Sequence, residues 1–190
     1  MSYKRVKSKN YNYIFDPKTG FFERWGKNKN DNPFMCPFGP EMVDIKIFDG
    51  NGFMSLENFK LILSKLPQMV TKINLGVVPL YDNSPLKKIL IYANNKMEYV
   101  PNITIKNQIV SDDWAEFLTD KCGVINIIHG DKELCYKAVH QLIKWDSNNV
   151  NIHKTVTQES FDSCLSLIED VREDPHLEEL NSVIFLSLKK

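Results

Sequence analysis

The feature that most constrains this chain is a strand, a short turn and a helix that follow one another within residues 41–66. Val43–Ile47 alternates apolar and charged residues, which predicts a β-strand with one apolar face. From Leu56 to Leu66 the apolar residues recur at helical spacing, and Ser55 is placed to cap the start of that helix. The same order of strand and helix recurs through the rest of the chain, so this unit predicts the architecture.

Strands and helices are predicted to alternate from residue 43 to the end of the chain. The strands are expected near residues 43–48, 71–76, 99–105, 123–129, 150–154 and 181–188, and the helices near residues 55–66, 84–95, 111–121, 131–145 and 159–173. Alternation of this kind predicts right-handed βαβ units and a parallel sheet.

The segment before the first of these strands has a different pattern. Residues 12–15 and 21–25 are rich in aromatic residues and flank a turn that contains proline and glycine, which predicts a β-hairpin. We therefore expect two domains, with a hairpin and connector over residues 1–40 and the strand–helix domain over residues 41–190.

The two faces of the predicted strands distinguish a partial barrel from a doubly wound sheet. A wound sheet is covered by helices on both faces, so its strands are apolar throughout. Here one strand face is polar, and its members are Asp44, Lys46, Lys72, Asn74, Asn102, Thr104, Asn126, Asn151 and His153. A closed small barrel would have to bury these groups, whereas an open one can present them to a ligand. The sequence therefore predicts an α/β fold, a partial (βα)6 TIM-like barrel with an N-terminal β-hairpin. In the alternative, these polar side chains hydrogen-bond one another and bind nothing.

Three residues near strand ends are candidates for a site, because parallel barrels place functional groups at the C-terminal ends of their strands. Gly76 ends the second predicted strand, and a glycine there lets a ligand approach the backbone closely. His129 and His153 lie at or near the ends of the fourth and fifth strands. The alternative for each of them is a histidine with a purely structural role.

The composition argues against several classes of partner. Lys plus Arg and Asp plus Glu balance at 24 each, so no net charge favours nucleic acid or an anionic membrane. The basic N-terminal residues, Lys4, Arg5, Lys7 and Lys9, are interpreted as a solvated end. No apolar run reaches membrane-spanning length, and there is no signal-peptide pattern. The four scattered cysteines fit reduced thiols, so we expect a cytoplasmic protein.

The turn after the first strand has a partial likeness to a calcium-binding loop. Asp49, Asn51 and Gly52 match the third, fifth and sixth positions of an EF-hand loop. The first and twelfth positions would be Ile47 and Asn58, where calcium requires a carboxylate and a bidentate glutamate. The sequence therefore argues against calcium at this turn.

Several segments, in order along almost the whole chain, resemble the radical S-adenosylmethionine superfamily, and especially a phage- and bacteria-associated group of its members. They are TGFFERWG at 19–26, PFGPEMVDI at 37–45, MSLE at 54–57, VPNITI at 100–105, DKELCY at 131–136, VNIH at 150–153 and FLSLK at 185–189. The resemblance implies a partial barrel in which a [4Fe-4S] cluster reductively cleaves S-adenosylmethionine and starts radical chemistry on a substrate. It leaves the substrate, the catalytic residues and the oligomeric state open.

The resemblance also implies a set of cofactor-binding residues at the strand ends. They are Gly76, Asn102, Thr104, His129, Asn151 and His153. Gly76 stands where the family has the loop for the methionine amino group, while His129, Asn151 and His153 would approach the nucleoside or the substrate.

One departure from the family pattern decides the expected function. The family holds its cluster with a CxxxCxxC motif in the loop after the first strand, which is here Phe48–Met54 and contains no cysteine. The cysteines of this chain, Cys36, Cys122, Cys135 and Cys164, fit no part of that motif. We therefore expect no cluster and no cleavage of S-adenosylmethionine by the chain as written.

Three explanations for the missing cysteine motif at Phe48–Met54 stay open. They are a degenerate homologue, an edited or truncated chain, and a sequence from which the cluster loop has been left out. The alternative function is a non-catalytic barrel scaffold or interaction protein.

Overall fold

The computed structural model describes residues 4–16, 21–33, 35–67, 70–96, 99–145 and 149–187. By its internal contacts the chain divides into two compact units. Unit 1 comprises residues 1–76 and 85–102, and unit 2 comprises residues 77–84 and 103–190. The domain boundary expected after residue 40 stays a prediction.

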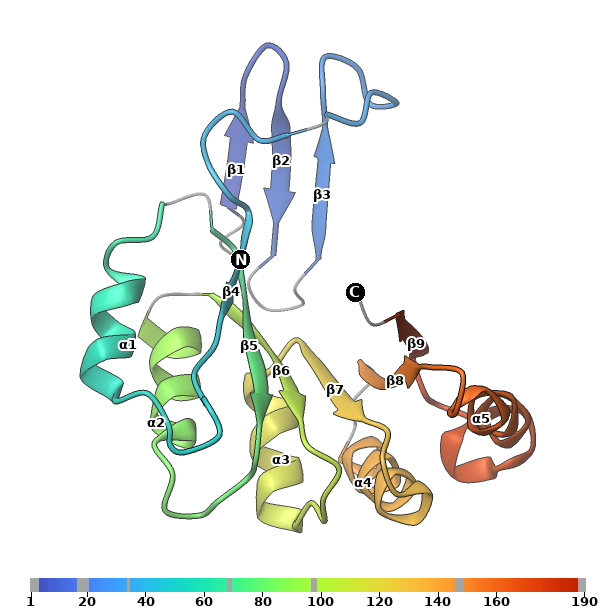
Figure 1. Cartoon of the computed structure of the whole chain (residues 1–190). Helices are drawn as coiled ribbons and strands as arrows, with labels where there is room; N and C mark the ends of the chain where they lie inside the picture. Colours follow the sequence, from blue (N-terminus) through green and yellow to red (C-terminus); the bar gives the residue numbers. More distant parts are fainter. Residues whose placement is uncertain are drawn as a thin grey trace. The chain divides into compact units, whose positions relative to one another are not determined.

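The described strands form two sheets (Figure 1). The first is antiparallel and contains β1 (Lys4–Lys7), β2 (Asn12–Phe15) and β3 (Phe22–Trp25). The second has six strands in sequence order: β4 (Met42–Ile45), β5 (Lys72–Val78), β6 (Val100–Ile105), β7 (Val124–Ile128), β8 (Val150–Val156) and β9 (Ser182–Ser187). The pairs β4–β5, β7–β8 and β8–β9 are parallel. The α/β class, the six-stranded sheet and the hairpin are confirmed, whereas the partial (βα)6 TIM-like barrel stays a prediction.

Each predicted helix is present, with ends that differ by a few residues. The helices are α1 (Leu56–Leu63), α2 (Leu86–Ile91) with a π-helical continuation η1 (Tyr92–Lys96), α3 (Asp112–Lys121), α4 (Lys132–Lys144), α5 (Phe161–Glu173) and the 3-10 turn η2 (Pro175–Leu177). Ser55, Ser111 and Asp131 cap α1, α3 and α4 through side-chain oxygens that accept a first-turn N–H. These local signals explain why the helices begin where the sequence predicts.

The N-terminal segment differs from its prediction. Lys4–Lys7 does not form a free solvated end, because it pairs antiparallel with β2 as strand β1. Val6, the one apolar residue of that strand, packs against the buried cluster of Tyr11, Tyr13, Phe15 and Val100. The segment has too few apolar residues to be recognised as a strand from its own sequence, so the pairing depends on β2.

A carboxylate ties the three-stranded sheet to the start of the parallel strands within unit 1. Glu41 accepts a hydrogen bond from the hydroxyl of Tyr11 and an ion pair from Arg24 at 2.7 Å. The backbone oxygen of Glu41 accepts the N–H of Thr71, next to β5, at 2.9 Å. One residue therefore connects β2, β3, β4 and the entry to β5.

The strands β5 and β7 each have one buried apolar face, as their alternation predicts. In β5, Ile73 and Leu75 are buried while Lys72 and Asn74 remain partly exposed. In β7, Ile125 and Ile127 are buried and the residues between them are partly exposed. Within unit 2, α4 contacts β7 and β8 while α5 contacts β8. The polar positions are therefore the less covered ones in these strands.

Candidate functional site

Polar side chains of neighbouring strands form hydrogen-bonded rows, one in each unit. In unit 1, Asn74 lies opposite Asp44 in the parallel register and donates to its carboxylate at 2.7 Å. Asn102 donates to the amide oxygen of Asn74 at 2.9 Å. The Oδ1 atom of Asn102 is buried and has no hydrogen-bond partner within the described part of the chain.

The second row lies within unit 2 and joins residues of four strands, β6 to β9. Asn126 donates to Thr104 at 3.3 Å, and Asn151, which lies opposite Asn126, donates to its amide oxygen at 2.9 Å. The oxygen of Asn151 in turn accepts from Asn181 and from Ser182, each at 2.7 Å. Asn151 is only 5% exposed, so these bonds satisfy most of its capacity.

These rows give the polar strand face a structural role. Most of the amides on this face hydrogen-bond to neighbouring polar side chains, which is the alternative that the sequence left open. Among the groups on this face, the Asn102 oxygen in unit 1 and the His153 imidazole in unit 2 have no hydrogen-bond partner within the described ranges, so both retain capacity for a ligand. Whether the six predicted residues bind a cofactor stays a prediction.

His153 lies in β8 two residues after Asn151, and successive residues of a strand point to opposite faces, so both share the polar face. Its imidazole is half-buried, and the described residues give it no hydrogen-bond partner. Its backbone oxygen accepts the N–H of His129 at 2.8 Å. Burial lowers the pKa of His153, which favours the neutral ring, with one donor and one acceptor nitrogen.

Gly76 lies inside β5 and not at its end, because the strand continues to Val78. A Cβ atom built at Gly76 would lie 3.8 Å from the Cα of Lys46, which is an ordinary contact. Within unit 1 the strand therefore does not require glycine here, and its role at a ligand stays a prediction.

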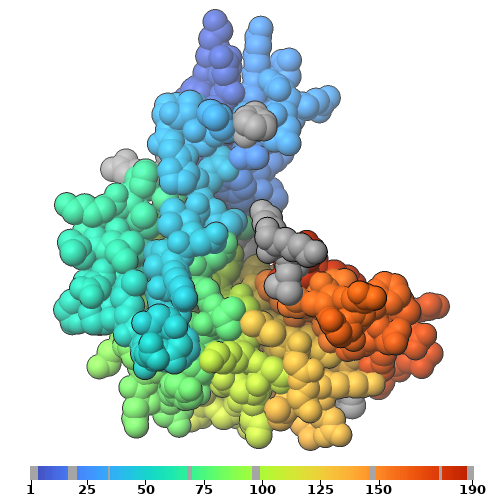
Figure 2. All heavy atoms as spheres, viewed as in Figure 1, coloured from blue at the N-terminus to red at the C-terminus, as the bar shows by residue number. Residues whose placement is uncertain are grey.

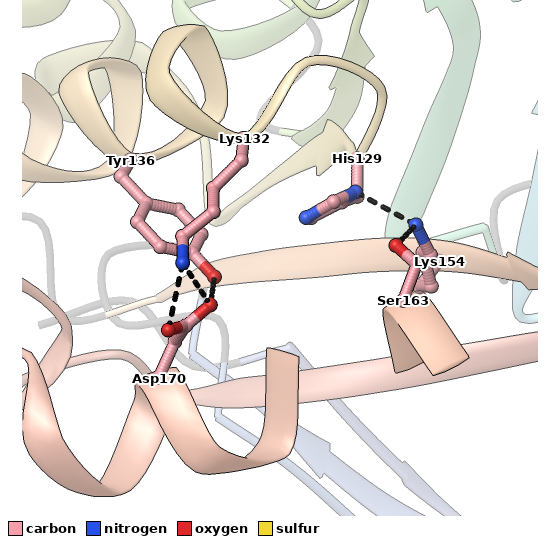
Figure 3. Close-up of polar contacts among 6 residues, drawn as sticks. All are labelled: His129, Lys132, Tyr136, Lys154, Ser163 and Asp170. Carbon is pink, nitrogen blue, oxygen red and sulfur yellow. Dashed lines mark hydrogen bonds and ion pairs between the residues drawn. The ribbon is translucent and has the colours of Figure 1, made fainter. Parts of the chain in front are cut away.

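His129 directly follows β7 and joins a group of three side chains (Figure 3). The amine of Lys154 lies 3.0 Å from Nδ1 of His129 and 2.7 Å from Oγ of Ser163, near the start of α5. Lys154 is 7% exposed, while Ser163 is exposed. Burial, together with the nearby Lys154 charge, lowers the pKa of His129, so the neutral ring accepts the lysine's hydrogen bond.

A second group in Figure 3 joins α4 to α5. Asp170 accepts a hydrogen bond from the Tyr136 hydroxyl at 2.7 Å and forms an ion pair with Lys132 at 2.8 Å. Partial burial raises the pKa of Asp170, but the bonds from Lys132 and Tyr136 outweigh it, so the pKa stays below its ordinary value. Burial and the Asp170 carboxylate raise the pKa of Tyr136. The Tyr136 ring packs edge-on to His129, with centroids 6.3 Å apart, so the two groups are adjacent.

Lys154 is the residue that sequence reasoning missed. It follows Val150 and Ile152 at the spacing of two that defines the apolar face of β8. A lysine in that pattern is the available signal, because a charged side chain on a helix-covered face needs polar partners. His129 and Ser163 are those partners, and neither is near Lys154 in sequence.

The loop that would carry an iron–sulfur cluster in the resembled family is a compact turn. Met54 N–H donates to the Ile47 oxygen at 2.7 Å, and Phe48 and Phe53 form a β-bridge with ring centroids 5.0 Å apart. The carboxylate of Asp49 accepts the N–H groups of Asn51 and Gly52 at 2.8 and 3.0 Å.

These two hydrogen bonds from backbone N–H groups lower the pKa of Asp49. The exposed tip of the turn lies in the segment drawn in cyan in Figure 2. The turn offers no thiolate, so its residues do not fit a [4Fe-4S] cluster.

The four cysteines lie outside this turn in the sequence, and all are free. Cys135 and Cys164 are buried, while Cys36 and Cys122 are partly exposed. Burial raises the pKa of Cys135 to about 12, although the Lys154 charge acts in the opposite direction, so the thiol stays protonated. Among the residues that the structure describes, no group of three or more His, Cys, Asp or Glu side chains is arranged to hold a metal ion.

A cavity of about 430 Å³ lies along α4 in unit 2. Its lining consists of Lys132, Glu133, Tyr136, Lys137, His140 and Asp174. The lining mixes cationic and acidic groups, and the predicted cofactor residues are not among it.

Two further findings bear on the class of protein. None of the helices in the described ranges is long and apolar enough to cross a membrane. Comparison with protein-family models, with curated proteins and with solved structures found no match to this chain.

Proposed function

We propose that this chain is a radical-SAM-like protein that binds S-adenosylmethionine on the polar face of its parallel strands and does not cleave it. The observation that carries the proposal is His153, a neutral, half-buried imidazole without a polar partner among the described residues. A neutral imidazole can donate to and accept from the hydroxyl groups of a ribose or the edge of an adenine. It also adds no positive charge beside the cationic sulfonium.

The neighbouring residues support a fixed position for that imidazole. Asn151, two residues earlier in β8, is held by hydrogen bonds to Asn126, Asn181 and Ser182. A rigid strand limits the conformational entropy that a ligand-binding side chain loses on binding. The polar row therefore serves as the support, and His153 as the group left for the ligand.

Titration calorimetry with S-adenosylmethionine tests the binding. We expect binding to the wild-type chain to give a measurable heat. His153→Ala should bind S-adenosylmethionine about tenfold more weakly, because it loses roughly one hydrogen bond. His140→Ala, an exposed histidine on α4, is the matched control and should bind as the wild type does. No heat with the wild type, or equal weakening by both variants, contradicts the proposal.

The absence of cleavage is tested separately. Iron–sulfur ligation requires thiolates close together in space, and the turn at Phe48–Met54 contains none. Anaerobic reconstitution with iron and sulfide, followed by an assay for 5′-deoxyadenosine, should yield no product. Turnover by this chain with a stable cluster would overturn this part of the proposal.

The second candidate function is an interaction protein that binds no metabolite, and exposed apolar side chains favour it. Phe161, Leu165 and Ile168 are exposed and stand at helical spacing on α5, the helix drawn in orange in Figure 1. The strand β9 stands last in its sheet and exposes most of its apolar residues. Because β9 is the last strand of its sheet, it can pair antiparallel with β9 of a second copy about a two-fold axis.

Light scattering of the full chain decides between a monomer and that dimer. A dimer that Phe185→Glu converts to a monomer, together with no heat from S-adenosylmethionine, supports this second candidate over the first. A monomer at every concentration contradicts the β9 pairing.

A further inference from the structure

We propose that Ser163 is an activated nucleophile toward small acyl esters, with Lys154 as its base and His129 as a positioning residue. This activity is independent of the proposed binding of S-adenosylmethionine. It uses unit 2 alone and the side of β8 opposite to His153.

The geometry has the arrangement required of an activated serine. The nucleophile must be accessible, and Ser163 is exposed near the start of α5. The base must lie within hydrogen-bond reach, and the Lys154 amine is 2.7 Å from Oγ. A third group must orient the base, and His129 Nδ1 lies 3.0 Å from the same amine.

The polar partners of Lys154 leave its amine within reach of the serine. Its recorded polar partners among the described residues are an imidazole and a hydroxyl, and no carboxylate hydrogen-bonds to it. The Lys154 ammonium donates to Ser163 and lies within hydrogen-bond distance of His129. Once it has given up one proton, the amine keeps N–H donors for His129 and has a lone pair that can take the proton of Ser163.

The start of α5 supplies a place for the negative charge of the reaction. Ser160 is the N-cap residue, but its hydroxyl donates to the Thr155 oxygen at 3.0 Å and accepts the Thr157 N–H at 2.8 Å. No side chain caps the helix as a result. The N–H groups of a first helical turn have no intrahelical partner, so those beside Ser163 can stabilise an oxyanion.

The proposed step balances without a cofactor. Oγ of Ser163 forms a bond to the ester carbonyl carbon, and the bond from that carbon to the alcohol oxygen breaks. The serine proton passes to Lys154 and then to the departing alcohol. Water repeats the step on the acyl-serine with the same proton transfers, which releases the acid and restores the serine.

An alkyl fluorophosphonate tests the proposal on the intact chain, because it traps activated serines. Attack forms an Oγ–P bond, breaks the P–F bond and releases fluoride, while the proton goes to Lys154. Peptide mass mapping should locate the adduct on Ser163. Ser55, which caps α1 and hydrogen-bonds the Asn58 N–H, is an internal control and should stay unlabelled.

Variants then separate a base from a packing residue. Lys154→Met and Lys154→Arg should each slow the labelling by about 10²-fold or more, because arginine keeps the charge but cannot accept a proton. Ser166→Ala, an exposed serine on the same helix, should label at the wild-type rate. His129→Ala should slow labelling, and His129→Asn, which keeps an acceptor, should restore part of it.

The wild-type result alone can overturn the proposal, whatever the variants do. Labelling of Ser163 no faster than that of Ser55 shows that the serine is not activated. Equal rates for the wild type and Lys154→Arg, with the melting temperatures matched, show that Lys154 is not its base.

Discussion

Two adjacent residues of β8 have opposite roles because neighbouring side chains of a strand point to opposite faces. His153 lies on the polar face with Asn151, where it keeps hydrogen-bonding capacity. Lys154 lies on the helix-covered face and bonds to His129 and Ser163. The chemistry of each residue follows from its face, and the two sites proposed here are therefore independent at this scale.

The protonation of buried histidines makes stability depend on pH. Burial lowers the pKa of both His129 and His153 from an ordinary value of 6.5. Below pH 6.5 the unfolded chain binds protons that the folded chain does not, so the free energy of unfolding falls as the pH drops and is greatest above 6.5. Each unit of pKa shift contributes about 1.4 kcal/mol.

Urea unfolding between pH 8 and pH 5 measures this dependence. The free energy of unfolding of His153→Gln should depend less on pH than that of the wild type, since the substitution removes one of the two histidines whose pKa is lowered. NMR titration of the His153 ring should report a pKa below 6.5. Identical pH slopes in the two proteins, or a ring that titrates above 6.5, would contradict this prediction.

At the scale of the elements, side-chain amides reinforce the pairing of β7, β8 and β9. Asn126, Asn151 and Ser182 occupy matching positions in the parallel register, so a one-residue shift of any strand breaks the row. Backbone hydrogen bonds alone do not select a register. The amide row therefore specifies how these strands align.

Asn151→Leu should lower the free energy of unfolding by about 1–3 kcal/mol, because it removes the donor to the Asn126 amide oxygen and the acceptor shared by Asn181 and Ser182. Asn149→Ala, an exposed residue one position before β8, is the control and should stay within about 0.5 kcal/mol of the wild type. Urea denaturation followed by circular dichroism measures both. A neutral result for Asn151→Leu would show that the row adds nothing to stability.

At the scale of the whole molecule, two sheets of different kinds belong to one chain, and unit 1 contains the whole of the antiparallel sheet. The buried cluster of Tyr11, Tyr13, Phe15 and Val100 joins that sheet to the start of β6. Glu41 adds a polar connection through Tyr11 and Arg24. The hairpin is therefore packed onto the parallel strands of its unit through both apolar and charged contacts.

Glu41→Ala should destabilise the protein by about 1.5–3 kcal/mol, because the Arg24 guanidinium and the Tyr11 hydroxyl lose a charged acceptor. Glu23→Ala, an exposed glutamate in β3, is the matched control and should be near neutral. Chemical denaturation compares the two. Equal stability of both variants would show that Glu41 does not anchor the sheet.

Local patterns in the sequence were sufficient for the elements. The alternation of apolar residues predicted the six parallel strands. The alternation of strand and helix patterns predicted the five helices, with Ser55 as the cap of the first. Aromatic strands around a proline-containing turn predicted the pairing of β2 with β3, although residues 17–20 of that turn lie outside the described residues. Each of these signals acts over a few residues, so a single sequence contains it in full.

Tertiary structure decided the partners of residues far apart in the chain. Lys4–Lys7 became a strand because β2 offers it an edge. Asn102 donates its amide N–H to Asn74, while its oxygen has no partner within the described ranges. The group of His129, Lys154 and Ser163 exists because the end of β7, the middle of β8 and the start of α5 meet in space. The sequence determined which residues are polar, but hydrogen bonds act over about 3 Å, so only the folded chain determines which of them meet.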